Sequence, residues 1–319
     1  MSEQPGPLPL LAAEEVDILV VMDNFVDLLL AGDQRVERLS LAADGEVPRD
    51  TLVAEHGLSL FITIGGGGVQ TSLLMDAGYS QLGVPHNLDL LGLDLSGVEA
   101  VVLSHGHMDH FGALPEVLRR VGRPVPLVVH PAAFAGPRYL VPPVGERMRF
   151  PGLQRRELEA AGAQIVEARR PFLAPSRLWA ATGQVERTTP FEKGLPIAFR
   201  EEGGELIPDP LEDDQGVVIH LKDKGLVVIS GCAHAGIVNT VRHAQRLTGV
   251  ERVYAVLGGF HLGGMLFEGI IEPTVEALRE LSPRVVVPMH CTGRKATEAM
   301  ARAFPQAFVL SSVGSRLHL

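Results

Sequence analysis

The chain has 319 residues, 46% of them hydrophobic and 21% charged, so it carries enough apolar side chain for a large core. With 28 Lys and Arg residues against 38 Asp and Glu, the formal net charge is −10, which argues against nucleic acid as a partner. The sequence has no apolar run long enough to span a membrane and no secretory signal at its start. The two cysteines, Cys232 and Cys291, are too few for a disulfide framework. We therefore expect a cytoplasmic protein without a membrane partner.

Strands dominate the predicted elements of the first half. Residues 1–15 are polar and are expected to be ragged, and residues 27–50 are expected to form a loop. Apolar, β-branched segments predict strands at residues 16–25, 58–64, 71–76, 98–104 and 126–130. Four glycines at 65–68 predict a hairpin turn, and LPEVLRRV at 114–121 predicts a helix whose proline lies in the first turn.

The second half begins with an irregular segment and then alternates strands with helices. Residues 131–215 are rich in proline turns, and we interpret them as an excursion over the surface or a lid. The pattern then predicts strands at 217–221, 226–230, 253–257 and 284–288, and helices at 237–247, 272–281 and 296–304. Such a pattern is typical of an α/β (α+β) protein with helices outside its sheets. No linker interrupts it, so we expect one domain over residues 1–319.

The densest group of potential metal ligands is the segment SHGHMDH at residues 104–110. His105 and His107 alternate at the end of a strand, so both side chains can point the same way. Asp109 and His110 follow after the chain has turned. Imidazole nitrogens and carboxylate oxygens are ligands that Zn²⁺ prefers, with Fe or Mn as alternatives. Because one ion rarely takes four ligands from one short loop, the spacing predicts two divalent metal ions.

Further candidate ligands each follow an apolar strand. Asp76 ends SLLMDAG, Cys232 and His234 lie in VVISGCAHAG, His261 lies in AVLGGFHLGG, and His290 and Cys291 lie in VVVPMHCTG. Strand ends converge at one edge of a sheet, so residues far apart in sequence can build one site.

These segments resemble a known family. HGHMDH is similar to the HxHxDH signature of the metallo-β-lactamase superfamily of dinuclear metallohydrolases. Together with SGCAHAGIVNTV, GGFHL and PMHCTG, it resembles the branch named after 7,8-dihydropterin-6-yl-methyl-4-(β-D-ribofuranosyl)-aminobenzene 5′-phosphate synthase. The resemblance runs from about residue 16 to the C-terminus and implies an αββα sandwich of two mixed sheets with the metal site at one edge.

The resemblance also implies roles for individual residues. His105 and His107 match ligands of the first metal, whereas Asp109, His110 and His290 match ligands of the second. Asp76 matches the aspartate that orients the ligand loop through hydrogen bonds.

Two positions depart from the superfamily pattern. Where it has a histidine before the hairpin, this chain has PDPLEDDQG, which contains Asp213 and Asp214. Where it has a bridging aspartate, this chain has Gly-Cys-Ala-His at 231–234. Cys232 or His234 is the expected replacement ligand, and Asp214 is a third possibility.

Three functions remain open from the sequence. The first is a metal-dependent hydrolase in which Asp109 orients a metal-activated water and His261 binds substrate or donates a proton. The second is the synthase reaction of the branch, which joins a pterin methyl group to a ribofuranosyl-aminobenzene phosphate. The third is a non-catalytic metal-binding protein. The expected partner is a small molecule, with phosphorylated or pterin-like compounds as candidates; the substrate, the oligomeric state and the identity of the metal are left open.

Overall fold

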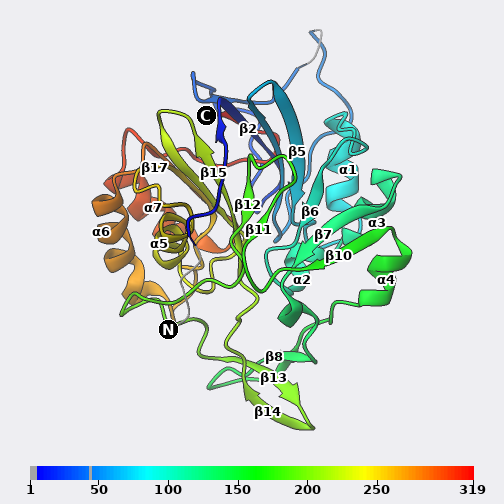
Figure 1. Ribbon diagram of the computed structural model, residues 1–319, viewed down its shortest axis with the longest axis vertical. Helices are drawn as coiled ribbons and strands as arrows, with labels where there is room; N and C mark the ends of the chain where they lie inside the picture. The colour runs from blue at the N-terminus through cyan, green and yellow to red at the C-terminus, as the bar shows by residue number, and fades with distance from the viewer. Residues whose placement is uncertain (1–5, 43–44) are drawn as a thin grey trace.

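The computed structural model describes residues 6–42 and 45–319 of the chain. Two large sheets lie face to face in the centre, and helices cover the outer face of each (Figure 1). This αββα arrangement confirms the predicted fold class. No helix in the described part of the chain is long and apolar enough to cross a membrane.

The first sheet has eight strands. They are β2 (Glu15–Met22), β3 (Val36–Glu37), β4 (Ser59–Gly66), β5 (Val69–Met75), β6 (Ala100–Val102), β7 (Val125–Val129), β10 (Ala163–Glu167) and β19 (Arg316–His318). Their order is β10-β7-β6-β5-β4-β2-β19-β3. Gly67 and Gly68, with φ of 60° and 76°, form the β4–β5 turn, as a tight hairpin requires.

The second sheet has seven strands. They are β1 (Ala12–Ala13), β11 (Phe172–Leu173), β12 (Ala180–Ala181), β15 (Gly216–Leu221), β16 (Gly225–Ser230), β17 (Val253–Gly259) and β18 (Val285–Met289). The predicted hairpin of β15 and β16 is confirmed, and β16, β17 and β18 run parallel to one another.

Helices connect the parallel strands and cover the sheets. The helices are α1 (Gly83–Leu90), α2 (Met108–Phe111), α3 (Leu114–Val121), α4 (Arg155–Ala160), α5 (Ile237–Thr248), α6 (Ile271–Leu281) and α7 (Arg294–Ala303). The short 3₁₀ turns are η1 (Pro131–Phe134), η2 (Glu268–Ile270) and η3 (His290–Thr292). Helices α1, α3 and α4 lie outside the first sheet, and α5, α6 and α7 lie outside the second (Figure 1).

Alternating side chains of the two sheets form the central core. Ile18, Leu60 and Ile62 of the first sheet and Ile229 and Leu257 of the second belong to one buried cluster. Two further clusters lie between each sheet and its helices. The β-branched runs seen in the sequence are therefore strands buried on both faces.

The interpretation of residues 131–215 as irregular is wrong. This segment contributes β10 to the first sheet and β11 and β12 to the second. It also forms a third sheet of four short strands, β8 (Arg138–Leu140), β9 (Met148–Arg149), β13 (Ala198–Glu202) and β14 (Glu205–Pro208). The strands are too short to give a clear period-two pattern, and proline turns separate them.

The expected ragged start is also partly wrong. Residues 1–5 lie outside the described residues, but β1 pairs with β15, and β2 begins at Glu15. Helix α1 and the strands β3 and β19 were not predicted from the sequence either.

Candidate metal centre

The loops after five strands carry the predicted site residues to one edge of the two sheets. Asp76 follows β5, residues 105–110 follow β6, Cys232 and His234 follow β16, His261 follows β17, and His290 follows β18. Parallel pairing of β5 with β6 and of β16 with β17 and β18 places these strand ends at the same edge within each sheet.

Three imidazoles form a first group. Nε2 of His105 lies 3.0 Å from Nδ1 of His107, and Nε2 of His234 lies 3.2 Å and 3.1 Å from those two atoms. All three side chains are buried. The structure thus brings His234, rather than Asp214, next to His105 and His107.

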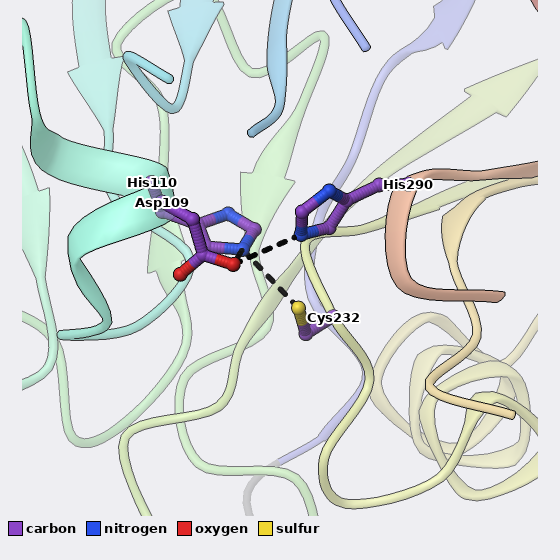
Figure 2. Close-up of side chains that lie close together, drawn as sticks. All are labelled: Asp109, His110, Cys232 and His290. Carbon is purple, nitrogen blue, oxygen red and sulfur yellow. Dashed lines mark hydrogen bonds and ion pairs between the residues drawn. The ribbon is translucent and has the colours of Figure 1, made fainter. Parts of the chain in front are cut away.

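Asp109, His110, Cys232 and His290 form a second group (Figure 2). Nε2 of His290 lies 3.2 Å from Oδ2 of Asp109, and Nε2 of His110 lies 3.2 Å from the Cys232 sulfur. Cys232 also groups with His105 and His234, so its sulfur lies between the two sets.

Asp76 supports the second group from behind. Its carboxylate accepts hydrogen bonds from the backbone N–H and the hydroxyl of Ser104, both at 2.8 Å, and lies 2.7 Å from Nδ1 of His110. A carboxylate at this position holds the proton on Nδ1 and leaves the lone pair of Nε2 facing the site.

His290 has a corresponding support that the sequence analysis missed. Its Nδ1 lies 2.9 Å from Oδ1 of Asn24, and its backbone N–H donates to Oδ1 of Asp23 at 2.8 Å. The predicted strand over residues 16–25 included this Asp-Asn pair, but β2 ends at Met22, directly before it. The usable signal was its position directly after a buried strand.

Asp213 and Asp214 do not join the ligand groups. Asp213 accepts from the backbone N–H of Gly106 at 2.8 Å and pairs with the buried Arg138. Asp214 accepts from the backbone N–H of Ala235 at 2.8 Å, next to His234. Among the described residues, Asp214 therefore supports the ligand loop and belongs to none of the potential metal groups.

Burial sets the protonation of the first group. Burial, followed by neighbouring imidazoles, lowers the pKa of His105 and His234 well below the usual range. Burial and the charge of Arg138 lower the pKa of His107 to about 4. These three rings are neutral at pH 7, which is the form that binds a metal.

The second group holds opposite charges. Burial lowers the pKa of His110, but the Asp76 and Asp109 carboxylates outweigh burial and raise the pKa to about 9. Burial raises the pKa of Asp109, but His110 and His290 outweigh burial and bring it below its usual range. Burial raises the pKa of Asp214 to about 7.

A cavity of about 220 Å³ opens beside both groups. Its lining includes Asp109, His261 and Cys291, the exposed His56, and Phe150, which follows β9. Phe150 stacks on the ring of His107 at a centroid distance of 5.0 Å. The sequence analysis missed His56, which lies 3.7 Å from the Asp109 carboxylate, because no motif surrounds it.

The donor set fits metal ions. The three nitrogens of the first group lie 3.0–3.2 Å from one another, and neutral imidazoles cannot all donate to one another at once. Tetrahedral ligation of zinc at about 2.0–2.1 Å separates nitrogen ligands by roughly this distance. Buried nitrogen, oxygen and sulfur ligands therefore surround two positions that a cation could occupy.

Residues 56–290 match the model of the metallo-beta-lactamase superfamily, a span that contains all the ligands described above. The chain belongs to this superfamily. It is also similar to the 7,8-dihydropterin-6-methyl-4-(beta-D-ribofuranosyl)-aminobenzene-5'-phosphate synthase of Methanocaldococcus jannaschii. The two are 30% identical over 257 residues, which cover 80% of this chain and 87% of the synthase. The resemblance to this branch is thereby confirmed.

Two other proteins are similar to this chain over most of their length. The uncharacterized protein MJ0448 of Methanocaldococcus jannaschii is 29% identical over 82% of this chain and 92% of its own length. The crystal structure of Tm1679, a metal-dependent hydrolase of the superfamily, aligns with a TM-score of 0.72 and 27% identity. That alignment covers 95% of this chain and 98% of Tm1679.

Proposed function

We propose that this metallo-beta-lactamase-type protein is a metal-dependent hydrolase that attacks an ester or phosphoester bond of a small molecule with a metal-activated water. The observation that carries the proposal is the convergence of two ligand groups on the Cys232 sulfur beside a cavity. The superfamily membership and the similarity to Tm1679, a metal-dependent hydrolase, support it.

We assign one ion to His105, His107 and His234, and the other to Asp109, His110 and His290. The Cys232 thiolate would take the place of the superfamily's aspartate as a ligand, because its sulfur groups with both sets. Zn²⁺ suits this mixture of imidazole, carboxylate and thiolate, and Fe or Mn are the alternatives. When bound, the two ions supply Lewis-acid activation of a water molecule and of the oxygen at the reacting centre.

The chain's own residues orient these ligands. Asp76 and Asn24 hold protons on the outer nitrogens of His110 and His290, so that the inner nitrogens face the site. Asp109 has a second carboxylate oxygen that can accept a hydrogen bond from the attacking nucleophile and orient it. The proton-donating role of His261 stays a prediction, because its position also suits a ligand role, argued below.

The test measures metal content and hydrolysis on the same samples. We expect about two ions per chain by mass spectrometry, and metal-dependent turnover of an aryl phosphodiester, phosphomonoester or acetate ester. Asp109→Asn should lower kcat by about 100-fold or more, in line with the usual contribution of a positioned acid–base group. His86→Ala, on α1, is the matched histidine control and should keep activity.

Two results would contradict the proposal. A protein without stoichiometric metal would remove its basis. Unchanged turnover in a metal-retaining Asp109→Asn variant would favour the non-catalytic metal-binding protein.

A second candidate function is the synthase reaction, favoured by the 30% identity to the synthase over 80% of this chain. The same site would then activate a pterin-like substrate for transfer to a ribofuranosyl-aminobenzene phosphate. Incubating the metal-loaded protein with a dihydropterin phosphorylated on its 6-methyl group and with ribofuranosyl-aminobenzene phosphate distinguishes the two functions. Formation of the joined product favours the synthase. Release of inorganic phosphate from the pterin compound without coupling favours the hydrolase.

A further inference from the structure

The chain's two cysteines come together, although 58 residues separate them. The thiol of Cys291 lies 3.6 Å from the backbone oxygen of Cys232. The chain has only two cysteines in 319 residues, so their proximity is not explained by a high cysteine content. Neither cysteine is in a disulfide.

His261 completes a third group with the two thiols. One ligand atom each from Cys232, His261 and Cys291 lies within 4.8 Å of the other two. Nδ1 of His261 is buried and finds no hydrogen-bond partner among the described residues. Burying a ring nitrogen without a hydrogen-bond partner costs free energy, so such an atom indicates that a ligand, such as a metal ion, interacts with it.

The backbone around this group is strained at each of its three corners. Ala233, His261 and His290 have φ of 54°, 46° and 47°, in the left-handed region that other residues than glycine rarely adopt. Such conformations persist where the surrounding structure requires them, and they gather at functional sites. Here each lies on, or directly next to, one member of the third group.

A glycine makes room for the second thiol. A Cβ atom at Gly259 would lie 2.7 Å from the Cys291 sulfur and 3.2 Å from Cα of Cys232. It would lie closer still, at 2.4 Å, to the backbone oxygen of Gly231, so any side chain at position 259 would clash with the Cys232 segment and with the Cys291 thiol. The close approach of the thiols depends on a specific residue of the neighbouring strand.

We propose that Cys232, His261 and Cys291 form a third metal-binding position, which takes a thiolate-preferring divalent cation such as zinc. Two sulfurs and one imidazole, with a fourth position open, match the ligand set of known open zinc sites. The fourth position faces the cavity, because all three residues line it. With the two other ions in place Cys232 would already be a thiolate, so binding at the third position would displace only the proton of the Cys291 thiol.

This position goes beyond the proposed hydrolase, which needs only the two ligand groups assigned above. In it, His261 holds a cation instead of donating a proton. Cys291, which has no part in the proposed reaction, becomes a ligand.

Cobalt titration of the metal-free, full-length protein without oxygen tests the proposal. We expect three Co²⁺ per chain in the wild type and two in Cys291→Ser and in His261→Gln. The sulfur-to-cobalt charge-transfer absorption should also weaken in Cys291→Ser, because one Co–S bond is lost. Met265→Ala is the matched control from the same loop, since its side chain is 90% exposed, and should bind three.

Alkylation of Cys291 gives a second measurement that needs no variant. Iodoacetamide labelling, mapped by mass spectrometry, should be about tenfold or more slower in the metal-saturated wild type than after chelation. Equal labelling rates, or two ions in both the wild type and Cys291→Ser, would overturn the third position and leave the dinuclear site intact. A wild type that binds no ion would overturn both proposals.

Discussion

The two halves of the metal centre are built in different ways. The first half gives four ligands from one six-residue loop, and buried carboxylates bind that loop through its backbone and side chains. The second half gives its ligands one or two at a time, from the ends of β16, β17 and β18, at corners with left-handed backbone. Hydrogen bonds support both halves, but the first half relies on buried carboxylates, whereas the second half adds left-handed backbone next to its ligands.

The largest expected effect concerns the charges behind the first half. Arg138 donates to both carboxylate oxygens of Asp213 at 2.8 Å and lies 3.0 Å from Asp209, with all three side chains 5% exposed or less. Arg138→Met leaves two buried carboxylates without a cation. We expect a loss of about 3–5 kcal/mol in the free energy of unfolding, measured by urea denaturation of metal-free protein.

The pH dependence of that loss has a definite sign. Burial raises the pKa of Asp213, but the Arg138 charge outweighs burial and lowers it below 3.8. A depressed carboxyl pKa contributes stability that is present above the unfolded value and is lost as the pH falls through the folded value. The difference between wild type and variant should thus shrink below about pH 4. Arg119→Met, which removes an exposed pair, should cost little at any pH.

The next effect compares the supports of His110 and His290. Asp76→Asn places an amide N–H against Nδ1 of His110, which moves the imidazole proton to Nε2 and blocks metal binding. Asn24→Leu only removes a neutral, exposed partner of His290. We expect metal affinity to fall by about 100-fold for Asp76→Asn and about tenfold for Asn24→Leu, measured by competition with a chromophoric chelator.

Equal losses in these two variants would contradict the difference between the halves. Ser96→Ala lies in the exposed loop between α1 and β6, away from the metal centre. It serves as the control and should leave metal affinity unchanged.

A third effect arises where the two halves touch. A Cβ atom at Gly231, beside Cys232, would lie 2.0 Å from the hydroxyl of Ser104 and 3.0 Å from the Asp76 carboxylate. Gly231→Ala should therefore destabilise the protein by about 1–3 kcal/mol through overpacking. Gly97→Ala, where a Cβ meets nothing within 4 Å, is the matched control in thermal or urea unfolding. Similar costs for the two variants would show that the halves are not in tight contact.

The same difference explains what the sequence could predict. The ligands of the first half could be predicted because His105, His107, Asp109 and His110 are neighbours in sequence. The apolar, β-branched segment before them also predicted the preceding strand. The strands and helices between residues 216 and 304 were also predicted closely, since their apolar runs are long, whereas the short β19 was missed. His56 and the role of Asp213 were not predictable, because each acts through a partner more than 50 residues away and no motif surrounds it. Asn24 had one signal, its place directly after a buried strand.

The prediction for residues 131–215 was wrong for a related reason. The strands of this segment have two to five residues, too few to show a period, and their partners lie in all three sheets. Phe150 contacts His107 only because tertiary pairing of β8 with β13 and β9 brings that segment over the cavity. Such a contact has no local signal.

The smallest expected effect tests the backbone of the second half. Ala233 has φ of 54°, and a left-handed alanine costs about 1–2 kcal/mol relative to the right-handed form. Ala233→Gly removes that strain but adds about 0.5–1 kcal/mol of unfolded-state entropy, so it should leave the free energy of unfolding unchanged or raise it by up to about 1 kcal/mol. Ala235, two residues on, is equally buried but has no positive φ. Ala235→Gly therefore adds only the unfolded-state entropy of glycine and should destabilise the protein by about 1 kcal/mol. Urea denaturation of both metal-free variants checks the pair. If Ala233→Gly were as costly as Ala235→Gly, the left-handed corner would carry no strain, and hydrogen bonding would account for both halves of the centre.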